Sequence, residues 1–277
     1  MAELPPGAAF VTASDGVRLY AEAHGQGEPV AFSPGYCQTH ENFRPQVASF
    51  VAAGFRPVLW DYRGHGLSDA PASPDAYSMT QVVDDLARVL AWAAPGQRAV
   101  VGGLSFGGLA SQHYALAYPE RVSALVLIAS GPGFKNQKAQ SDWESSIGRI
   151  ADRLERVGFT GWVSGRSAPL AIGLRPELPA AKAAGRAIEA QSAAGVARFG
   201  RCVAGPAPAT LDRLGEIRAP ALVLVGALDG AYLRAAEVMK AKLPNARSVV
   251  IPDAGHCVNL EQSEAFDRAV LEFLRSR

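Results

Sequence analysis

The sequence predicts an α/β fold in which a mostly parallel sheet is covered by helices on both faces and carries a helical lid insertion. Short, fully apolar runs recur along the chain next to helical patterns, and strands this apolar belong in a parallel sheet with both faces covered. One long helical stretch then interrupts this alternation. The 277 residues, of which 48% are hydrophobic, can build one such domain together with an insertion.

The expected elements follow from hydrophobic periodicity and turn residues. Strands are expected over residues 17–23, 30–33, 57–60, 99–102, 124–129, 221–225 and 248–251. The clearest helices are expected over residues 43–53, 78–92 and 106–118. Because the glycine turn at 25–27 separates the first two strands, we expect them to form a hairpin that leads into the sheet.

The interruption covers residues 132–211, between Gly131-Pro132-Gly133 and the strand at 221–225. It contains one amphipathic helix, which includes Ile147 and Leu154, and several alanine-rich helical pieces. Since it leaves after one strand and returns before the next, it should lie over the strand ends, where α/β sheets bind ligands. We therefore predict a core domain of residues 1–131 and 212–277 and a helical cap of residues 132–211.

Composition excludes several classes of function. The formal net charge of +1 gives no field for collecting nucleic acid or an anionic membrane surface. Three cysteines with no C-x-x-C spacing indicate neither a disulfide framework nor a zinc site. No secretory leader, membrane span, H-E-x-x-H or phosphate-binding glycine loop is visible. We expect a cytoplasmic protein without metal or cofactor; the oligomeric state stays open.

The pentapeptide Gly103-Leu104-Ser105-Phe106-Gly107 lies between an apolar strand and a helix. Glycines two residues either side of the serine allow a sharp, strained turn that presents the Ser105 hydroxyl above the sheet. The alternative is a glycine-rich helix start whose serine only caps the helix. The rest of the chain decides between the two.

A nucleophilic serine needs a base and an acid from later loops. His256 follows the last apolar strand, and Asp229 follows the strand at 221–225, which gives the order serine, acid, histidine. Asp253 is the competing acid, although its position suggests a turn residue. The oxyanion should be held by the backbone N–H groups of Phe106 and Tyr36.

Aromatic residues of the insertion are candidates for the wall of a substrate pocket. They are Phe134, Trp143, Phe159 and Trp162. The alternative is that aromatic residues at helical spacing form the core of the lid.

With these residues in place, the chain resembles the α/β-hydrolase fold family over nearly all its length. Besides the serine pentapeptide, the resemblance rests on Asp61-Tyr62-Arg63-Gly64-His65-Gly66-Leu67-Ser68, Tyr118-Pro119-Glu120-Arg121-Val122 and Gly255-His256 with Leu260-Glu261-Gln262. It implies a sheet of the eight-stranded type, with Ser105 as nucleophile, Asp229 as acid and His256 as base. One departure is Pro34-Gly35, which stands where members usually carry His-Gly.

These observations predict a cofactor-independent serine hydrolase that cleaves a small-molecule carboxylic ester or lactone through an acyl-enzyme. The serine argues against the dehalogenase and epoxide hydrolase branches, which use an aspartate at that position. Two alternatives stay open: a carbon–carbon bond hydrolase or lyase with the same triad, and a ligand receptor on a hydrolase scaffold. Fold kinship does not fix the reaction.

Overall fold

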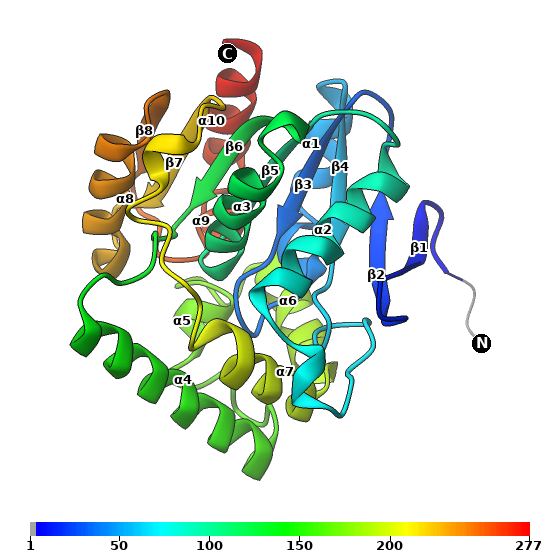
Figure 1. The fold of residues 1–277 in the computed structure, drawn as a ribbon, viewed down its shortest axis with the longest axis vertical. Coiled ribbons are helices and arrows are strands. Elements are labelled where there is room, and N and C mark those ends of the chain that lie inside the picture. Colours follow the sequence, from blue (N-terminus) through cyan, green and yellow to red (C-terminus); the bar gives the residue numbers. More distant parts are fainter. Residues whose placement is uncertain (1–3) are drawn as a thin grey trace.

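The computed structural model describes residues 4–277 and confirms the predicted fold class. Within these residues eight strands form one sheet in the order β1-β2-β4-β3-β5-β6-β7-β8 (Figure 1). The strands are β1 (Ala8–Thr12), β2 (Arg18–Ala23), β3 (Glu28–Ser33), β4 (Phe55–Trp60), β5 (Ala99–Leu104), β6 (Val122–Ile128), β7 (Ala221–Gly226) and β8 (Ala246–Ile251). Only the pairings of β2 with β1 and with β4 are antiparallel.

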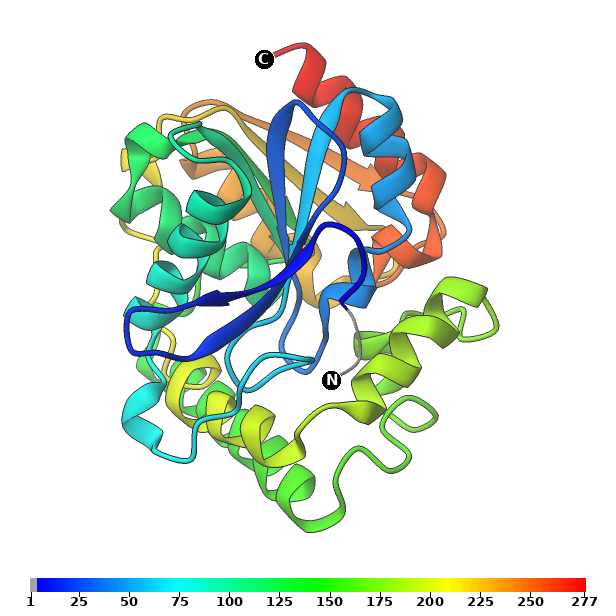
Figure 2. The ribbon, with the colours of Figure 1, turned by 90° about the vertical axis from the view of Figure 1, so that its right-hand side faces the viewer.

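Helices cover both faces of the sheet (Figures 1 and 2). The α-helices are α1 (Gln46–Ala52), α2 (Met79–Ala93), α3 (Phe106–Ala117), α4 (Gln137–Val157), α5 (Ala168–Ala171), α6 (Pro179–Ala190), α7 (Ala193–Phe199), α8 (Gly230–Lys242), α9 (Val258–Glu261) and α10 (Ser263–Arg275). Short 3-10 turns cover His40–Phe43, Pro74–Ala76, Pro119–Arg121 and Leu214–Glu216, and a π-turn covers Gly200–Ala204. Helices α2, α3 and α8 pack on one face, and α1 and α10 pack on the other.

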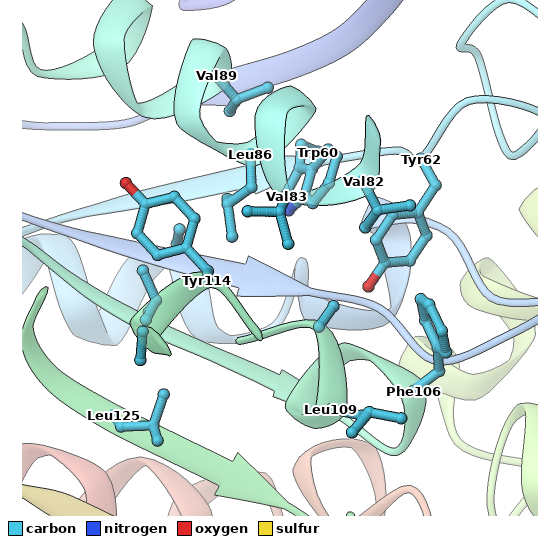
Figure 3. Packing of buried hydrophobic residues seen from close by; sticks show 14 of the residues in the cluster. Trp60, Tyr62, Val82, Val83, Leu86, Val89, Phe106, Leu109, Tyr114 and Leu125 are labelled. Atoms are coloured by element: carbon cyan, nitrogen blue, oxygen red, sulfur yellow. The ribbon is translucent and has the colours of Figure 1, made fainter. Parts of the chain in front are cut away.

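The apolar positions of α2 explain why this helix lies flat on the sheet. Val82, Leu86 and Val89 recur at helical spacing and are almost fully buried against the face that carries Trp60 (Figure 3). Burying one such side chain stabilises the fold by about 1.5–3 kcal/mol. A second apolar cluster, which includes Phe50 of α1 and Phe266 of α10, covers the opposite face. The sheet is therefore held from both sides.

The expected hairpin at the start of the chain is wrong. β2 does not pair with β3, because β4 lies between them; β2 forms its hairpin with β1, a strand that the sequence analysis did not predict. The turn at 25–27 instead passes the loop before β4, where a Cβ on Gly27 would lie 2.0 Å from the Gly54 carbonyl oxygen. Glycine is therefore needed in this turn because it packs closely against the loop at Gly54, and not because the turn joins a two-stranded hairpin.

The helix expected over residues 43–53 is shorter than predicted. Residues His40–Phe43 form a 3-10 turn, and α1 begins at Gln46 after Pro45. Proline has no N–H to donate to the preceding turn, so a helix starts after it more readily than it runs through it.

Helices α4 to α7 lie between β6 and β7 in the chain and cross the carboxyl ends of the strands (Figure 2). Ile147 and Leu154 of α4 are buried, and the Trp143 Nε1 of the same helix donates to the Ala204 carbonyl oxygen at 2.9 Å. These contacts hold α4 against α7 and the π-turn. None of the helices in residues 4–277 has the length and apolar character that a membrane span requires.

Candidate active site

Ser105 lies at the sharp turn between β5 and α3. Its backbone has φ 55° and ψ −115°, a conformation that non-glycine residues rarely adopt. Two hydrogen bonds hold it there: the Ser105 N–H donates to the Ile128 carbonyl oxygen at 2.8 Å, and the Ser130 hydroxyl donates to the Ser105 carbonyl oxygen at 2.7 Å. The end of strand β6 and the loop that follows it thus fix the strained residue.

The glycines around Ser105 are required by close packing against β3. A Cβ on Gly107 would lie 2.1 Å from the Ser33 carbonyl oxygen, and a Cβ on Gly103 would lie 2.5 Å from the same atom. Real Cβ atoms do not approach oxygen so closely, so either substitution would push the turn away from the sheet. The pentapeptide is therefore a turn that only glycine can flank, and not a simple capped helix start.

His256 and Asp229 come from adjacent loops and form a buried pair. The His256 Nδ1 lies 2.8 Å from the Asp229 Oδ2, and both side chains are 6% exposed. Asp229 directly precedes α8, and its loop is joined to the histidine loop by a 2.8 Å hydrogen bond from the Leu228 N–H to the Ala254 carbonyl oxygen. With Nδ1 donating to the carboxylate, Nε2 is left as the acceptor nitrogen of a neutral imidazole.

The competing acid, Asp253, is not bonded to His256. It is exposed, has φ 52°, and its carbonyl oxygen accepts from Arg175 and Gln262. A short polar side chain tolerates this left-handed conformation in a turn. Asp229 is thus the acid that the fold brings to the histidine.

Tyr36 and Phe106, the expected oxyanion residues, both border the same cavity as Ser105. Phe106 is the first residue of α3, where an N–H has no acceptor within its helix. Tyr36 follows β3, and its turn is fixed by the Gln38 side chain, which accepts from the Gly35 N–H at 2.9 Å. Among the described residues, the Tyr36 N–H has no acceptor. Its phenol points elsewhere and donates to the Val196 carbonyl oxygen.

A cavity of about 560 Å³ lies between the strand ends and helices α4 and α5. Ser105 and His256 are in its wall. Of the predicted pocket residues, Phe134, Trp143 and Trp162 line the cavity. Phe159 does not: it is buried behind Trp162, with ring centroids 5.7 Å apart. Its aromatic character indicated burial, but not which side of the inserted helices it would face.

The cavity also has lining residues that sequence reasoning did not assign to it. Ile147 and Ile150 of α4 belong to the predicted amphipathic helix, but helical periodicity does not separate a face packed on protein from one that borders a cavity. Tyr232 lies in the first turn of α8, three residues after Asp229. That spacing places both residues on the same side of the helix start. The distance in sequence from the predicted acid could therefore have assigned Tyr232 to the cavity.

In the described part of the chain, the Ser105 Oγ has one side-chain hydrogen-bond partner, the Tyr232 hydroxyl, at 3.3 Å. Among the described residues, the serine hydroxyl makes no hydrogen bond to His256. Catalytic hydrogen bonds are often long before substrate binds and shorten in the reacting complex. The arrangement supplies a strained serine, an acid-paired histidine and two free N–H groups around one space.

Charge is scarce in this cavity. Of the described residues that line it, none is Lys, Arg, Asp or Glu. Nor do residues 4–277 contain a group of three or more His, Cys, Asp or Glu side chains arranged to hold a metal ion. The polar atoms are those of the serine, histidine and tyrosine and of a few amide and hydroxyl side chains.

Known proteins share both the sequence pattern and the fold. A putative 2-succinyl-6-hydroxy-2,4-cyclohexadiene-1-carboxylate synthase of Bacillus subtilis is 29% identical over 98% of this chain and 99% of that protein. A pimeloyl-(acyl-carrier protein) methyl ester esterase of Edwardsiella ictaluri is 32% identical over 82% of this chain and 86% of that protein. The solved structure of a thermophilic esterase from Thermogutta terrifontis superimposes with a TM-score of 0.85 at 27% identity, over 97% of this chain and 98% of that one.

The profile of the alpha/beta hydrolase fold matches residues 28–263, which include β3 to β8 and the helices between them. This range contains Ser105, Asp229 and His256. The resemblance that the sequence motifs indicated is therefore confirmed. The chain belongs to the alpha/beta hydrolase fold family and is an enzyme of that fold.

Proposed function

We propose that this enzyme is a cofactor-independent serine hydrolase that cleaves a carboxylic ester or lactone through an acyl-enzyme. The observation that carries the proposal is the hydrogen bond that His256, which lines the same cavity as Ser105, forms with the buried Asp229. A serine hydroxyl is a weak nucleophile at neutral pH and needs an oriented base of this kind.

In the first half-reaction the Ser105 Oγ attacks the carbonyl carbon while the His256 Nε2 takes its proton. Asp229 orients the imidazole and stabilises the imidazolium that forms. The N–H groups of Tyr36 and Phe106 hold the negative oxygen of the tetrahedral intermediate. The carbon–oxygen bond to the leaving alcohol then breaks, and His256 returns the proton to that alcohol.

In the second half-reaction a water molecule attacks the acyl carbon and gives a proton to His256. The bond from the acyl carbon to Oγ breaks, Oγ recovers the proton, and the acid leaves. Residues 132–211 act as a cap in this proposal, because their helices form the outer wall of the cavity. A closed wall excludes water and strengthens the electrostatic contacts inside.

The lining favours a neutral, largely apolar acyl or lactone group. Many of the lining residues are aromatic and aliphatic side chains of the cap, and no described residue in the wall is a lysine or arginine. The name of the Bacillus subtilis relative contains a succinyl and a carboxylate group, which are anionic at neutral pH. Burying such a charge without a cationic partner is costly, so ester hydrolysis is the better-supported reaction.

Labelling with a fluorophosphonate probe, read by intact mass, tests the proposal. We expect one adduct on the native protein and none on Ser105→Ala or His256→Ala, because the probe reacts with an activated serine. Absence of an adduct on the folded native protein would overturn the activated serine and favour a ligand receptor.

Product analysis then separates hydrolysis from the lyase alternative. Neutral p-nitrophenyl and alkyl esters should yield an acid and an alcohol, and esters whose acyl group carries a carboxylate should react at least about tenfold more slowly. Faster turnover of the charged esters would contradict the assignment of substrate class.

A further inference from the structure

Among the described residues, the Tyr232 hydroxyl is the only side-chain group that forms a hydrogen bond with the Ser105 Oγ, at 3.3 Å. Its ring lies against the His256 ring, with centroids 4.9 Å apart and planes inclined by 36°. The side chain therefore touches both the proposed nucleophile and the proposed base. No step of the mechanism above uses it.

The position of Tyr232 is fixed by the same turn that fixes the acid. Asp229 precedes α8, and the Tyr232 N–H donates to the Asp229 carbonyl oxygen at 3.0 Å. A residue in the first turn of a helix is held by the hydrogen bonds that start the helix. The phenol is therefore delivered to the serine by a rigid part of the core and not by the cap.

The direction of the hydrogen bond follows from proton counting. The His256 Nδ1 faces Asp229, so the Nε2 of the neutral ring has a lone pair and accepts the Ser105 proton when attack begins. A serine hydroxyl has one proton, so a second hydrogen bond to its oxygen must be donated by the partner. Burial raises the pKa of Tyr232, which keeps the phenol protonated and able to donate.

We propose that Tyr232 is a further catalytic residue, whose hydroxyl donates to the Ser105 Oγ and stabilises the negative charge on that oxygen during attack and again during its departure. This inference rests on the proposed hydrolase function. Tyr232 keeps its proton throughout, and His256 carries the transferred proton. The oxyanion N–H groups act on the carbonyl oxygen, so the two sets of donors stabilise different atoms.

Tyr232→Phe removes the hydroxyl and keeps the ring that packs on His256. A hydrogen bond to a developing charge is stronger than one between neutral groups, and we expect kcat on a neutral p-nitrophenyl ester to fall about 10- to 100-fold. KM should stay within about twofold, since the interaction forms fully only in the transition state. The rate of fluorophosphonate labelling should fall by a similar factor, because it also needs attack by Oγ.

Tyr77→Phe is the matched control. Tyr77 is a buried tyrosine whose hydroxyl also makes one hydrogen bond, to the Pro71 carbonyl oxygen at 2.9 Å, and it does not line the cavity. The activity and the labelling rate of the Tyr77→Phe variant should equal those of the native protein. Melting temperatures of both variants show whether either change acts through folding.

Two results would overturn the role of Tyr232 while leaving the hydrolase proposal intact. One is a Tyr232→Phe variant as active as the native enzyme with a Tyr232→Leu variant impaired, which would make the ring, and not the hydroxyl, the important part. The other is a faster Tyr232→Phe variant, which would mean that the phenol restrains the serine. Failure of the native protein to be labelled at all would instead contradict the hydrolase function.

Discussion

Residues 4–277 contain two buried histidine–aspartate pairs with the same bond and different surroundings. In each, a histidine Nδ1 lies 2.8 Å from an aspartate Oδ2: His256 with Asp229, and His40 with Asp61. His256 of the first pair lines the cavity together with Ser105, whereas neither His40 nor Asp61 lines it. A histidine–aspartate pair therefore has no function by itself. The groups that surround the other ring nitrogen, Nε2, decide its role.

At His40 the second nitrogen faces carboxylates. Its Nε2 lies 3.4 Å from Glu41 and 3.6 Å from Glu22. Burial alone would lower the pKa of His40, but the carboxylates around it, led by Asp61, outweigh burial and raise the pKa to about 10. The ring is therefore an imidazolium at neutral pH, with no lone pair to accept a proton from a nucleophile. Its chemistry is that of a buried ion pair.

The loop around Asp61 is built to hold that charge. The carboxylate accepts from the N–H groups of His40 at 2.7 Å and of Leu67 at 2.9 Å, and a Cβ on Gly66 would lie 2.1 Å from it. Gly66 has φ 49°, so the loop wraps round the carboxylate where a side chain would not fit. The family-like motif at residues 61–68 is thus structural, although it supplies the aspartate of a histidine–aspartate pair.

The largest expected contrast is in activity. Asp229→Asn keeps the shape of the acid but favours the wrong tautomer of His256, and kcat should fall about 10⁴-fold. Asp61→Asn should leave kcat of the folded protein within about tenfold of the native value, since it acts only on folding. Steady-state kinetics on a neutral p-nitrophenyl ester compare the two. Equal losses would mean that the two pairs are not distinct in function.

Stability should show the reverse order. His40→Gln leaves the Asp61 carboxylate buried without its cationic partner, and the free energy of unfolding should fall by about 3–5 kcal/mol. His256→Ala removes a ring at the cavity wall, where water can fill the space and hydrate Asp229, and it should cost less than about 2 kcal/mol. Urea unfolding followed by circular dichroism measures both. A larger loss for His256→Ala would contradict the structural role assigned to His40.

The pH dependence of stability should come from the His40 region. Its ordinary pKa of 6.5 is raised to about 10 on folding, so its contribution is complete below pH 6.5 and is lost as the pH rises towards 10. Arg44 helps to lower the pKa of Glu22 to about 2 against the effect of burial, so that carboxylate contributes above pH 4.5 and loses its contribution towards pH 2.

Urea unfolding at intervals from pH 6 to pH 10 measures the alkaline decline. The slope should be smaller in His40→Gln, which has no imidazole to titrate, and unchanged in Tyr77→Phe. An equal slope in His40→Gln and the native protein would assign the decline to another group.

The sequence predicted most of the sheet, because buried parallel strands are continuous apolar runs. It also predicted that the loops of Ser105, Asp229 and His256 lie at one edge of the sheet, because the carboxyl ends of parallel strands meet there. It did not predict that β4 lies between β2 and β3, since strand pairing depends on contacts far apart in the chain. The sequence also did not show that Trp162 lines the cavity whereas Phe159 does not, and it did not assign Tyr232 to the site. Which side of a helix borders a cavity is decided by packing and not by periodicity.

The smallest expected effect concerns the acid that lies nearest to His256 in sequence. Asp253→Asn keeps a residue that tolerates φ 52° in this exposed turn and removes only a charge that makes no bond to His256. The kcat should stay within about twofold of the native value, and stability should change by less than about 0.5 kcal/mol. The assay used for Asp229→Asn measures this directly. A loss of kcat approaching that of Asp229→Asn would assign the role of the acid to Asp253. The His256–Asp229 pair would then not be the pair that acts in catalysis.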